Sequence, residues 1–437
     1  MTAKMAMSVR NLESTAMIGD VRARARLARI ADGLVAAVAV SLPWSTSATG
    51  ILVVLWLIAL VPTLDPASVR REVMSAAGGL PLLLWALGVA GMLWADVGFK
   101  ERIAGMSGFH KLLLVPLLLA QFRRSGQAQW AFLGFLASSL LLLVVSWVLV
   151  LAPGLTWRGR SPGVPVKDYI FQSSIFAICA FGLIGQVAEL WRTRTRLVLG
   201  RAIGLALLAA AFIANIVYVA TARTTLVVMA VLLLLLGLRQ FRWRGALVAT
   251  LVGGVLTGGA WTSSPYLRER VSLAIEQVRG HGTADVNTSV GLRLEYWQKS
   301  LAFIAEAPVI GHGTGTIPQL FRRDATADTI PELLTTNPHS QVLTVAIQLG
   351  LIGALALIAM WIAHLALFRG GTLIAWFGLM VAVQNVVGSL FNSYLFDFSQ
   401  GWLYVLGVGI AGGMVLRAAP GAAKTDEKNE ERTEDKR

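Results

Sequence analysis

Residues 215–237 read NIVYVATARTTLVVMAVLLLLLG, which is two apolar runs separated by a few small and polar residues. Apolar runs of about 17–25 residues recur along the chain, and this length matches the hydrocarbon core of a bilayer. Of the 437 residues, 56% are hydrophobic and 14% are charged, whereas soluble domains carry about 25% charged residues. The sequence therefore predicts an all-α fold, a polytopic transmembrane helical bundle.

The apolar runs predict about 12 spans, near residues 28–43, 48–64, 78–94, 108–121, 129–152, 169–191, 200–220, 224–238, 245–261, 340–367, 371–390 and 401–417. Cytoplasmic loops collect lysine and arginine, and with the N-terminus inside, the short internal loops hold most of these residues. Both termini are therefore expected in the cytoplasm. The net charge of +14 follows from this orientation better than from nucleic-acid binding.

The predicted organisation has five parts: a cytoplasmic N-terminal segment at 1–27, nine transmembrane helices at 28–261, a periplasmic loop domain at 262–338, three transmembrane helices at 339–417 and a disordered cytoplasmic tail at 418–437. The arginines and apolar run at the start have no clear cleavage site after them, so a retained first helix is expected rather than a signal peptide. The tail mixes charges of both signs, which is typical of disorder.

The long polar segment 262–338 is expected to be functional, because loops of this length are uncommon. Residues 266–280 and 291–308 have helical apolar periodicity; in the second stretch the repeating residues are Leu294, Trp297, Leu301 and Ile304. These amphipathic helices are expected on the outer surface of the bundle or in the membrane interface. The stretch PVIGHGTGTIP at 308–318 predicts a glycine-rich turn, without the strand and lysine of a nucleotide-binding loop.

Three cations on the predicted external side are candidate site residues: Arg223, Arg293 and His339. Taken singly, each has an ordinary structural explanation. Arg223 can snorkel to the lipid headgroups, Arg293 can pair with an acidic side chain such as Glu295, and His339 can be a hydrogen-bonded structural residue. Taken together, two arginines suit a diphosphate and a histidine can accept a proton near neutral pH. This set suits displacement of a diphosphate by a hydroxyl.

Three segments carry a family resemblance: YVATARTTLVV, GLRLEYWQKSLAFIAEAPVIGHGTG and NPHSQVLTVAIQLGLIG. They resemble the O-antigen ligase and polymerase superfamily of bacterial envelope glycosyltransferases. In that superfamily an arginine follows a small-residue turn, a second arginine precedes a Trp-containing helix, and a histidine opens a late helix; here these are Arg223, Arg293 and His339. Ser340 stands where family members often have asparagine. The similarity is sharpest from about residue 215 to 355.

The resemblance implies an O-antigen ligase in the bacterial inner membrane, with its active site facing the periplasm. The donor would be an undecaprenyl-diphosphate-linked glycan, and the acceptor a lipid A–core sugar hydroxyl. His339 would position or deprotonate that hydroxyl, while Arg223 and Arg293 would hold the diphosphate. No cofactor, nucleotide or metal is expected, and the partners are these lipids rather than nucleic acid.

Further charged residues fall on the predicted external side. Arg158, Arg160 and Lys167 lie in an aromatic-containing loop, and they are either tolerated exceptions to the topology rule or phosphate-binding residues. The acidic pair Asp324 and Asp328 is better explained by a solvated loop. His281 and His312 are too isolated to predict zinc binding, and the single cysteine, Cys179, is expected in the core.

Two other readings within the superfamily stay open, a repeat-unit polymerase and a protein O-oligosaccharyltransferase, since both use the same donor. A transporter or flippase is the alternative from a different class. A carrier would be expected to show internal repeats or broken helices with charges at the membrane midplane. The sequence shows no repeat, and its candidate cations gather at one surface.

Overall fold

The computed structural model describes residues 2–156, 161–191, 196–269, 271–272, 289–325 and 331–419. Within these ranges every regular element is helical, and the predicted all-α class is confirmed. The longer helices are α1 (Thr2–Ser41), α2 (Thr46–Leu60), α3 (Pro66–Val73), α4 (Ala76–Gly91), α5 (Phe99–Met106), α6 (Leu114–Arg124), α7 (Gln129–Leu151), α8 (Tyr169–Leu190), α9 (Arg196–Tyr218), α10 (Arg223–Phe241), α11 (Trp243–Ser263), α13 (Ser289–Glu306), α14 (Ile317–Arg323), α15 (Gln341–Leu367), α16 (Leu373–Gly388) and α17 (Phe398–Ala418). Single 3₁₀ turns are η1 (Val61–Thr63), η2 (His110–Leu113), η3 (Pro153–Leu155) and η4 (Pro331–Leu333).

The number of helices that can cross a membrane is smaller than the sequence predicts. In the described ranges, eight helices are long and apolar enough, or ten if each of two bent helix pairs forms one span. The bent pairs are α3 with α4, at 80°, and α5 with η2–α6, at 49°. The other two predicted spans fall on α1 and on α16, which has 16 residues. All twelve predicted segments coincide with helices, but the count of about 12 spans is not confirmed.

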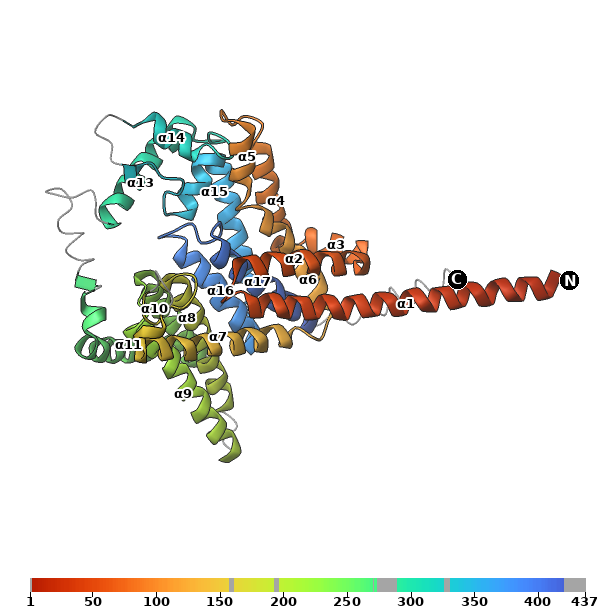
Figure 1. Cartoon of the computed structure of the whole chain (residues 1–437), viewed down its shortest axis with the longest axis horizontal. Helices are drawn as coiled ribbons and strands as arrows, with labels where there is room; N and C mark the ends of the chain where they lie inside the picture. The colour runs from red at the N-terminus through yellow and green to blue at the C-terminus, as the bar shows by residue number, and fades with distance from the viewer. Residues whose placement is uncertain are drawn as a thin grey trace.

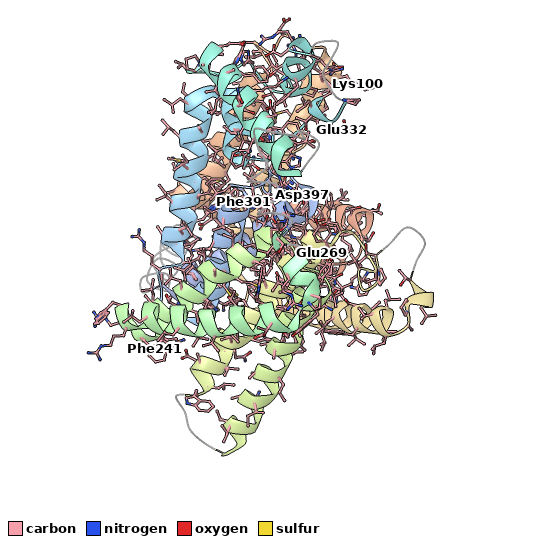
Figure 2. All side chains as sticks on the ribbon, turned by 90° about the vertical axis from the view of Figure 1, so that its left-hand side faces the viewer. Lys100, Phe241, Glu269, Glu332, Phe391 and Asp397 are labelled. Carbon is pink, nitrogen blue, oxygen red and sulfur yellow. The ribbon has the colours of Figure 1, made fainter. Side chains whose placement is uncertain are left out.

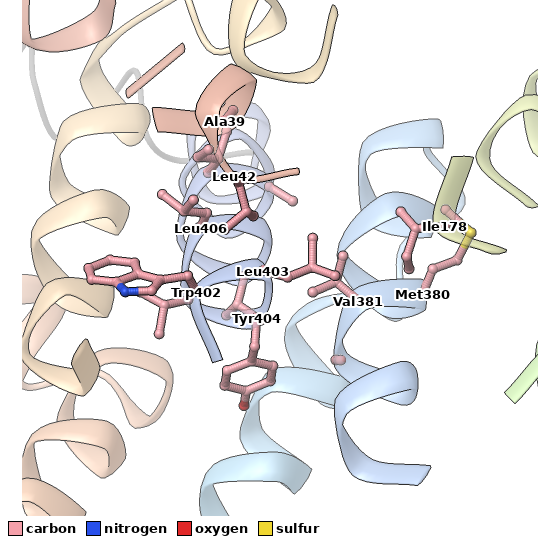
Figure 3. Close-up of a cluster of buried hydrophobic side chains, with 14 of the residues drawn as sticks. Ala39, Leu42, Ile178, Met380, Val381, Trp402, Leu403, Tyr404 and Leu406 are labelled. Carbon is pink, nitrogen blue, oxygen red and sulfur yellow. The ribbon is translucent and has the colours of Figure 1, made fainter. Parts of the chain in front are cut away.

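Helices α8, α15 and α17 form the centre of the bundle. In their most apolar stretches 78%, 61% and 67% of the residues are buried, whereas only 11% are buried in α11. Figure 3 shows Leu406 of α17 beside Leu42, which directly follows α1, and Leu403 of α17 beside Val381 of α16. The burial of these side chains fixes α17 between the first and the penultimate helix.

Close packing of α17 on α6 depends on glycines. A Cβ atom on Gly409 would lie 2.4 Å from Cβ of Leu118, and one on Gly413 would lie 2.7 Å from Cβ of Phe122. Small residues let two helices approach closely, which is a common source of helix association in membranes. The loop that precedes α17 is therefore held against a rigid pair of helices.

The predicted loop domain packs against the start of α15 (Figure 1). Tyr296 and Phe303 of α13, Phe321 of α14 and Ile347 of α15 lie in one buried cluster. The ring of Phe321 meets the other two aromatic rings edge-on, with centroids 6.0 Å from Tyr296 and 5.2 Å from Phe303. This second small core joins residues far apart in the chain.

The buried face of α13 differs from the predicted one. Leu301 is 60% exposed, whereas Tyr296, Ser300 and Phe303 are buried. These three residues also share one face of a helix by spacing, and Ser300 is small enough to let α13 approach its neighbours. The predicted residues Trp297 and Ile304 do pack against this cluster, so the prediction was correct for these two and overlooked Tyr296. In the first amphipathic stretch, residues 265–269 and 271–272 are helical, and the remainder lies outside the described residues.

Helix α15 is broken at Gly350, where φ is 61° and ψ is −157°, a combination open essentially to glycine. The glycine-rich turn 308–315 pairs with the backbone groups that this break releases. The hydrogen bonds run from the His312 N–H to the Ile347 carbonyl (2.9 Å), from Gly313 to Gln348 (2.9 Å), from Leu351 to Pro308 (2.8 Å) and from Ile352 to Val309 (3.3 Å). The glycine-rich turn is confirmed, and it anchors the loop domain to α15.

Candidate functional site

The three principal site residues lie at or near the starts of three helices. Arg223 is the first residue of α10, Arg293 lies near the start of α13, and His339 precedes α15 by two residues. The structure brings Arg293 and His339 near each other. The positive charge of Arg293 lowers the pKa of the His339 ring, which reflects this proximity. The two residues are separated by a long stretch of sequence, and the packing of α13 on α15 closes that separation.

His339 is held in an unusual backbone conformation. Its φ is 54°, in the left-handed region that non-glycine residues seldom adopt. The His339 N–H donates to Oδ1 of Asn337 at 2.9 Å, an asparagine turn that stabilises such a geometry. Helix α15 then begins at Gln341 after Ser340. The sequence predicted that the helix would begin near His339 itself; the ring instead stands on a turn just outside the helix.

The loop between α16 and α17 supplies the hydrogen-bond partner of the His339 ring. Nδ1 of His339 lies 3.1 Å from Oδ1 of Asn392. The same oxygen accepts from the Ser393 N–H at 2.8 Å and from Nδ2 of Asn337 at 3.1 Å. Figure 2 shows this loop, marked by Phe391 and Asp397, at the level between the α13–α14 layer and α8–α11.

One face of the His339 ring is covered by Tyr296 of α13. The two rings are stacked, with centroids 5.7 Å apart and planes inclined by 22°. The Tyr296 hydroxyl donates to the Glu332 carbonyl at 2.5 Å, and burial raises the pKa of Tyr296, which therefore stays neutral. Tyr296 fixes the plane of the imidazole without contributing charge.

The pKa of His339 is lowered from its ordinary value near 6.5. Burial is the largest cause and the positive charge of Arg293 is the second, while the hydrogen bond with Asn392 acts in the opposite direction. The ring is therefore neutral at pH 7 and can accept a proton.

Arg223 begins α10, directly after the turn that follows α9. Residues close to this turn lie near the α16–α17 loop. Thr225 is buried and its hydroxyl lies 2.9 Å from that of Ser173 on α8. Burial raises the pKa of Tyr394 to about 12, whereas the nearby side chains of Ser174 and Thr224 lower that pKa. The α16–α17 loop thus borders the start of α10 through Tyr394 and the His339 ring through Asn392.

Among the weaker candidates, Arg158 and Arg160 lie outside the described residues. Nζ of Lys167 donates to the Leu42 carbonyl at 2.5 Å and to Oγ of Ser399 at 3.0 Å. Burial lowers the pKa of Lys167 to about 8, against the raising effect of Asp397. These contacts tie the loop before α8 to α1 and α17, and they favour an anchoring role for Lys167. Phosphate binding by the three residues stays a prediction.

Metal ligands were not expected from the sequence. Within the described part of the chain, no group of three His, Cys, Asp or Glu side chains could hold a metal ion. Nε2 of His312 lies 2.8 Å from the Phe303 carbonyl, and Asp324 pairs with Arg323 at 2.9 Å. His281 and Asp328 lie outside the described residues. That the reaction needs no metal stays a prediction.

The sequence analysis missed Tyr296, Asn337 and Asn392 as site residues. Tyr296 and Asn337 stand inside quoted motifs, at GLRLEYW and NPHS, where only the charged or titratable residue was selected. Asn392 stands in FNSYLFDFSQ, a polar interruption between two apolar runs. Such an interruption at the predicted external side was the available signal, but it does not identify which polar residue faces the histidine.

No curated protein matches this chain. The family model described as O-Antigen ligase matches residues 208–358. The matched segment contains Arg223, Arg293 and His339, together with the glycine-rich turn and the break in α15. Asn392 and the α16–α17 loop lie beyond it. The match covers less than half of the chain, and it shows that this segment is similar to the O-antigen ligase family.

Proposed function

We propose that this protein is an O-antigen ligase of the bacterial inner membrane. It transfers a glycan from undecaprenyl diphosphate to a sugar hydroxyl of lipid A–core at the periplasmic face. The match to the superfamily supports a membrane glycosyltransferase of lipopolysaccharide biosynthesis. The observation that carries the site assignment is the convergence of His339, Arg293 and Tyr296 at the start of α15.

In the proposed reaction the acceptor hydroxyl oxygen attacks the anomeric carbon of the donor glycan. A new glycosidic C–O bond forms while the C–O bond to the diphosphate breaks, and undecaprenyl diphosphate leaves with the electron pair. The hydroxyl proton passes to the neutral ring of His339 and then to solvent. Because the pKa of His339 is lowered, its ring is neutral at pH 7 and can act as the base.

The arginines act on the leaving group. Negative charge grows on the diphosphate as the bond breaks, and a guanidinium presents donors in a fixed fork that suits phosphate oxygens. The electrostatic effect of Arg293 on the His339 ring supports this role for Arg293. Arg223, at the start of α10, adds its charge to the positive end of a helix dipole.

The acceptor distinguishes the ligase from its relatives. A repeat-unit polymerase would transfer to a growing glycan and a protein O-oligosaccharyltransferase to a serine or threonine. The deciding experiment incubates the purified protein with undecaprenyl-diphosphate-linked glycan and each acceptor separately, with His339→Ala as the inactive control. Transfer to lipid A–core is expected. Transfer only to glycan or only to protein would replace the ligase assignment.

The same assay tests the need for a metal. Because the energy of transfer resides in the lipid diphosphate and arginines neutralise its charge, transfer should continue in EDTA without nucleotide. Activity that EDTA abolishes and magnesium restores would contradict this part of the proposal.

The predicted orientation has its own test in whole cells. Ser263 is exposed at the end of α11, and Gly371 is exposed in the loop between α15 and α16. In a Cys179→Ala background, Ser263→Cys should react with an impermeant maleimide in intact cells. Gly371→Cys should react only after lysis, and the reverse pattern would place the site on the cytoplasmic side.

A further inference from the structure

The Asn392 side chain is surrounded by hydrogen-bond donors. Its Oδ1 lies 2.8 Å from the Ser393 backbone nitrogen, 3.1 Å from Nδ2 of Asn337 and 3.1 Å from Nδ1 of His339. A backbone N–H can only donate, so the atom that faces Ser393 is an oxygen. This contact fixes which way round the Asn392 amide stands, because only the amide oxygen can accept from a backbone N–H.

The Asn337 amide is fixed in the same way. The backbone N–H of His339 donates to Oδ1 of Asn337 at 2.9 Å, and the Ser393 hydroxyl donates to the same oxygen at 2.7 Å. Its Nδ2 must then face Asn392 as a donor. Two backbone N–H groups thus determine the orientation of both amides, without any assumption about the histidine.

These orientations determine where the His339 proton resides. An amide oxygen cannot donate, so the 3.1 Å contact with Nδ1 requires a proton on that nitrogen. A neutral imidazole carries one proton, which leaves Nε2 with its lone pair. Nε2 makes no hydrogen bond within the described part of the chain, and the side chain of His339 is only half-buried.

We infer that Asn392 is a positioning residue that holds His339 in the Nδ1–H tautomer and thereby presents Nε2 as the proton acceptor. Tyr296, stacked on the ring, prevents the imidazole from turning about its attachment. The opposite tautomer would place the Nδ1 lone pair against the Asn392 oxygen and a proton on Nε2, where the acceptor hydroxyl must arrive. The catalytic part of this inference rests on the proposed transferase function, whereas the tautomer itself does not.

Two substitutions at position 392 separate positioning from a merely structural role. Asn392→Ala removes the acceptor for Nδ1–H, so both tautomers become populated. Asn392→Asp keeps an acceptor for all three donors and adds a negative charge, which favours protonation of the ring. The aspartate variant should therefore retain the tautomer, while the acid limb of its pH–rate profile moves to higher pH. A matched control is Asn385→Ala. Asn385 is a buried asparagine on α16 that makes none of these contacts.

The first readout is independent of activity. Nitrogen-15 NMR of the full-length, histidine-labelled protein in lipid, with the His339→Ala spectrum subtracted, reports which ring nitrogen of His339 is protonated. At pH 7.5 the wild type and Asn392→Asp should show a protonated Nδ1 and a bare Nε2, and Asn392→Ala should show a mixture. A protonated Nε2 in the wild type overturns the inference.

The second readout is turnover. Asn392→Ala should lower kcat by at least ~10-fold, the usual scale for a lost supporting partner, and should leave donor binding unchanged. The kcat of Asn385→Ala should stay near the wild-type value, and so should that of Asn392→Asp at pH values above its acid limb. Wild-type kcat in Asn392→Ala overturns the positioning role. A wild type inactive on every acceptor would instead refute the proposed function, and the NMR result would still decide the tautomer. Should Asn392→Ala not fold, the wild-type spectrum and the aspartate variant decide both points.

Discussion

The two ends of α15 carry two histidines in opposite states. His364, near the cytoplasmic end predicted from the sequence, is fully buried, and both its nitrogens are engaged: Nε2 lies 2.8 Å from the Ala77 carbonyl and Nδ1 lies 2.5 Å from the Tyr404 hydroxyl. His339 is half-buried, and among the residues that the structure describes only its Nδ1 has a partner. A carbonyl accepts, so His364 carries its proton on Nε2, the tautomer opposite to that of His339.

His364 supplies a hydrogen-bond donor that α4 lacks because of Pro81. In a helix the Ala77 carbonyl would accept from the N–H of residue 81, but proline has none. The imidazole supplies the missing donor, so His364 completes the helix, and no lone pair remains free for chemistry. Of the two histidines, therefore, His339 is the one whose second nitrogen has no partner among the described residues and can accept a proton.

The largest expected effect comes from His339→Ala. Loss of a general base costs about 100-fold or more in rate, while thermal stability and donor binding should change little because the ring is half-buried. Transfer rate and melting temperature measured on the same purified sample check this. Near-normal transfer by a well-folded variant would make His339 a structural residue like His364.

Gly350→Ala tests whether the break in α15 holds the reactive end in place. A Cβ there would lie 2.3 Å from the Val309 carbonyl, and the backbone conformation is itself costly for alanine, by about 1–3 kcal/mol. We expect a lower melting temperature and reduced transfer. Gly254→Ala on α11, where a Cβ meets nothing within 4 Å, is the control and should leave both unchanged. Equal behaviour of the two variants would remove the break from the account.

His364→Phe tests the structural end of the comparison. It leaves the Tyr404 hydroxyl and the Ala77 carbonyl without their partner, at a cost of about 1–3 kcal/mol for each group. The melting temperature should fall while the transfer rate per folded molecule is retained. A variant of normal stability but without transfer would reverse the roles assigned to the two histidines.

Arg293→Gln gives the smallest expected shift, and it concerns pH. The positive charge of Arg293 lowers the pKa of His339, so its removal makes protonation easier and raises that pKa. Since His339 acts when neutral, the acid limb of the residual transfer activity should move to higher pH. Lys299→Gln, a charge removed elsewhere on α13, should leave the limb in place. A limb that does not move in Arg293→Gln would show that burial alone sets the pKa.

The sequence predicted the helical bundle because apolar runs of bilayer length depend only on composition. The predicted number of about 12 spans is not confirmed, since the bends between α3 and α4 and between α5 and α6 depend on packing. Nor did the sequence predict the partners of His339. Asn392 lies 53 residues away, on an element whose position depends on the glycine contacts between α17 and α6. Motif order could select Arg223, Arg293 and His339, but only the fold places Asn392 at Nδ1.

The length of α15 bears on the depth at which the reaction occurs. The break at Gly350 divides this helix, and residues 351–367 after the break extend about 25 Å at 1.5 Å per residue, close to the roughly 30 Å thickness of the hydrocarbon layer. With residues 351–367 in that layer, the part of α15 before the break, which is hydrogen-bonded to the glycine-rich turn, lies at the edge of the layer. We therefore expect His339 among the lipid phosphates, where a diphosphate can meet it while its polyprenyl chain stays in the bilayer.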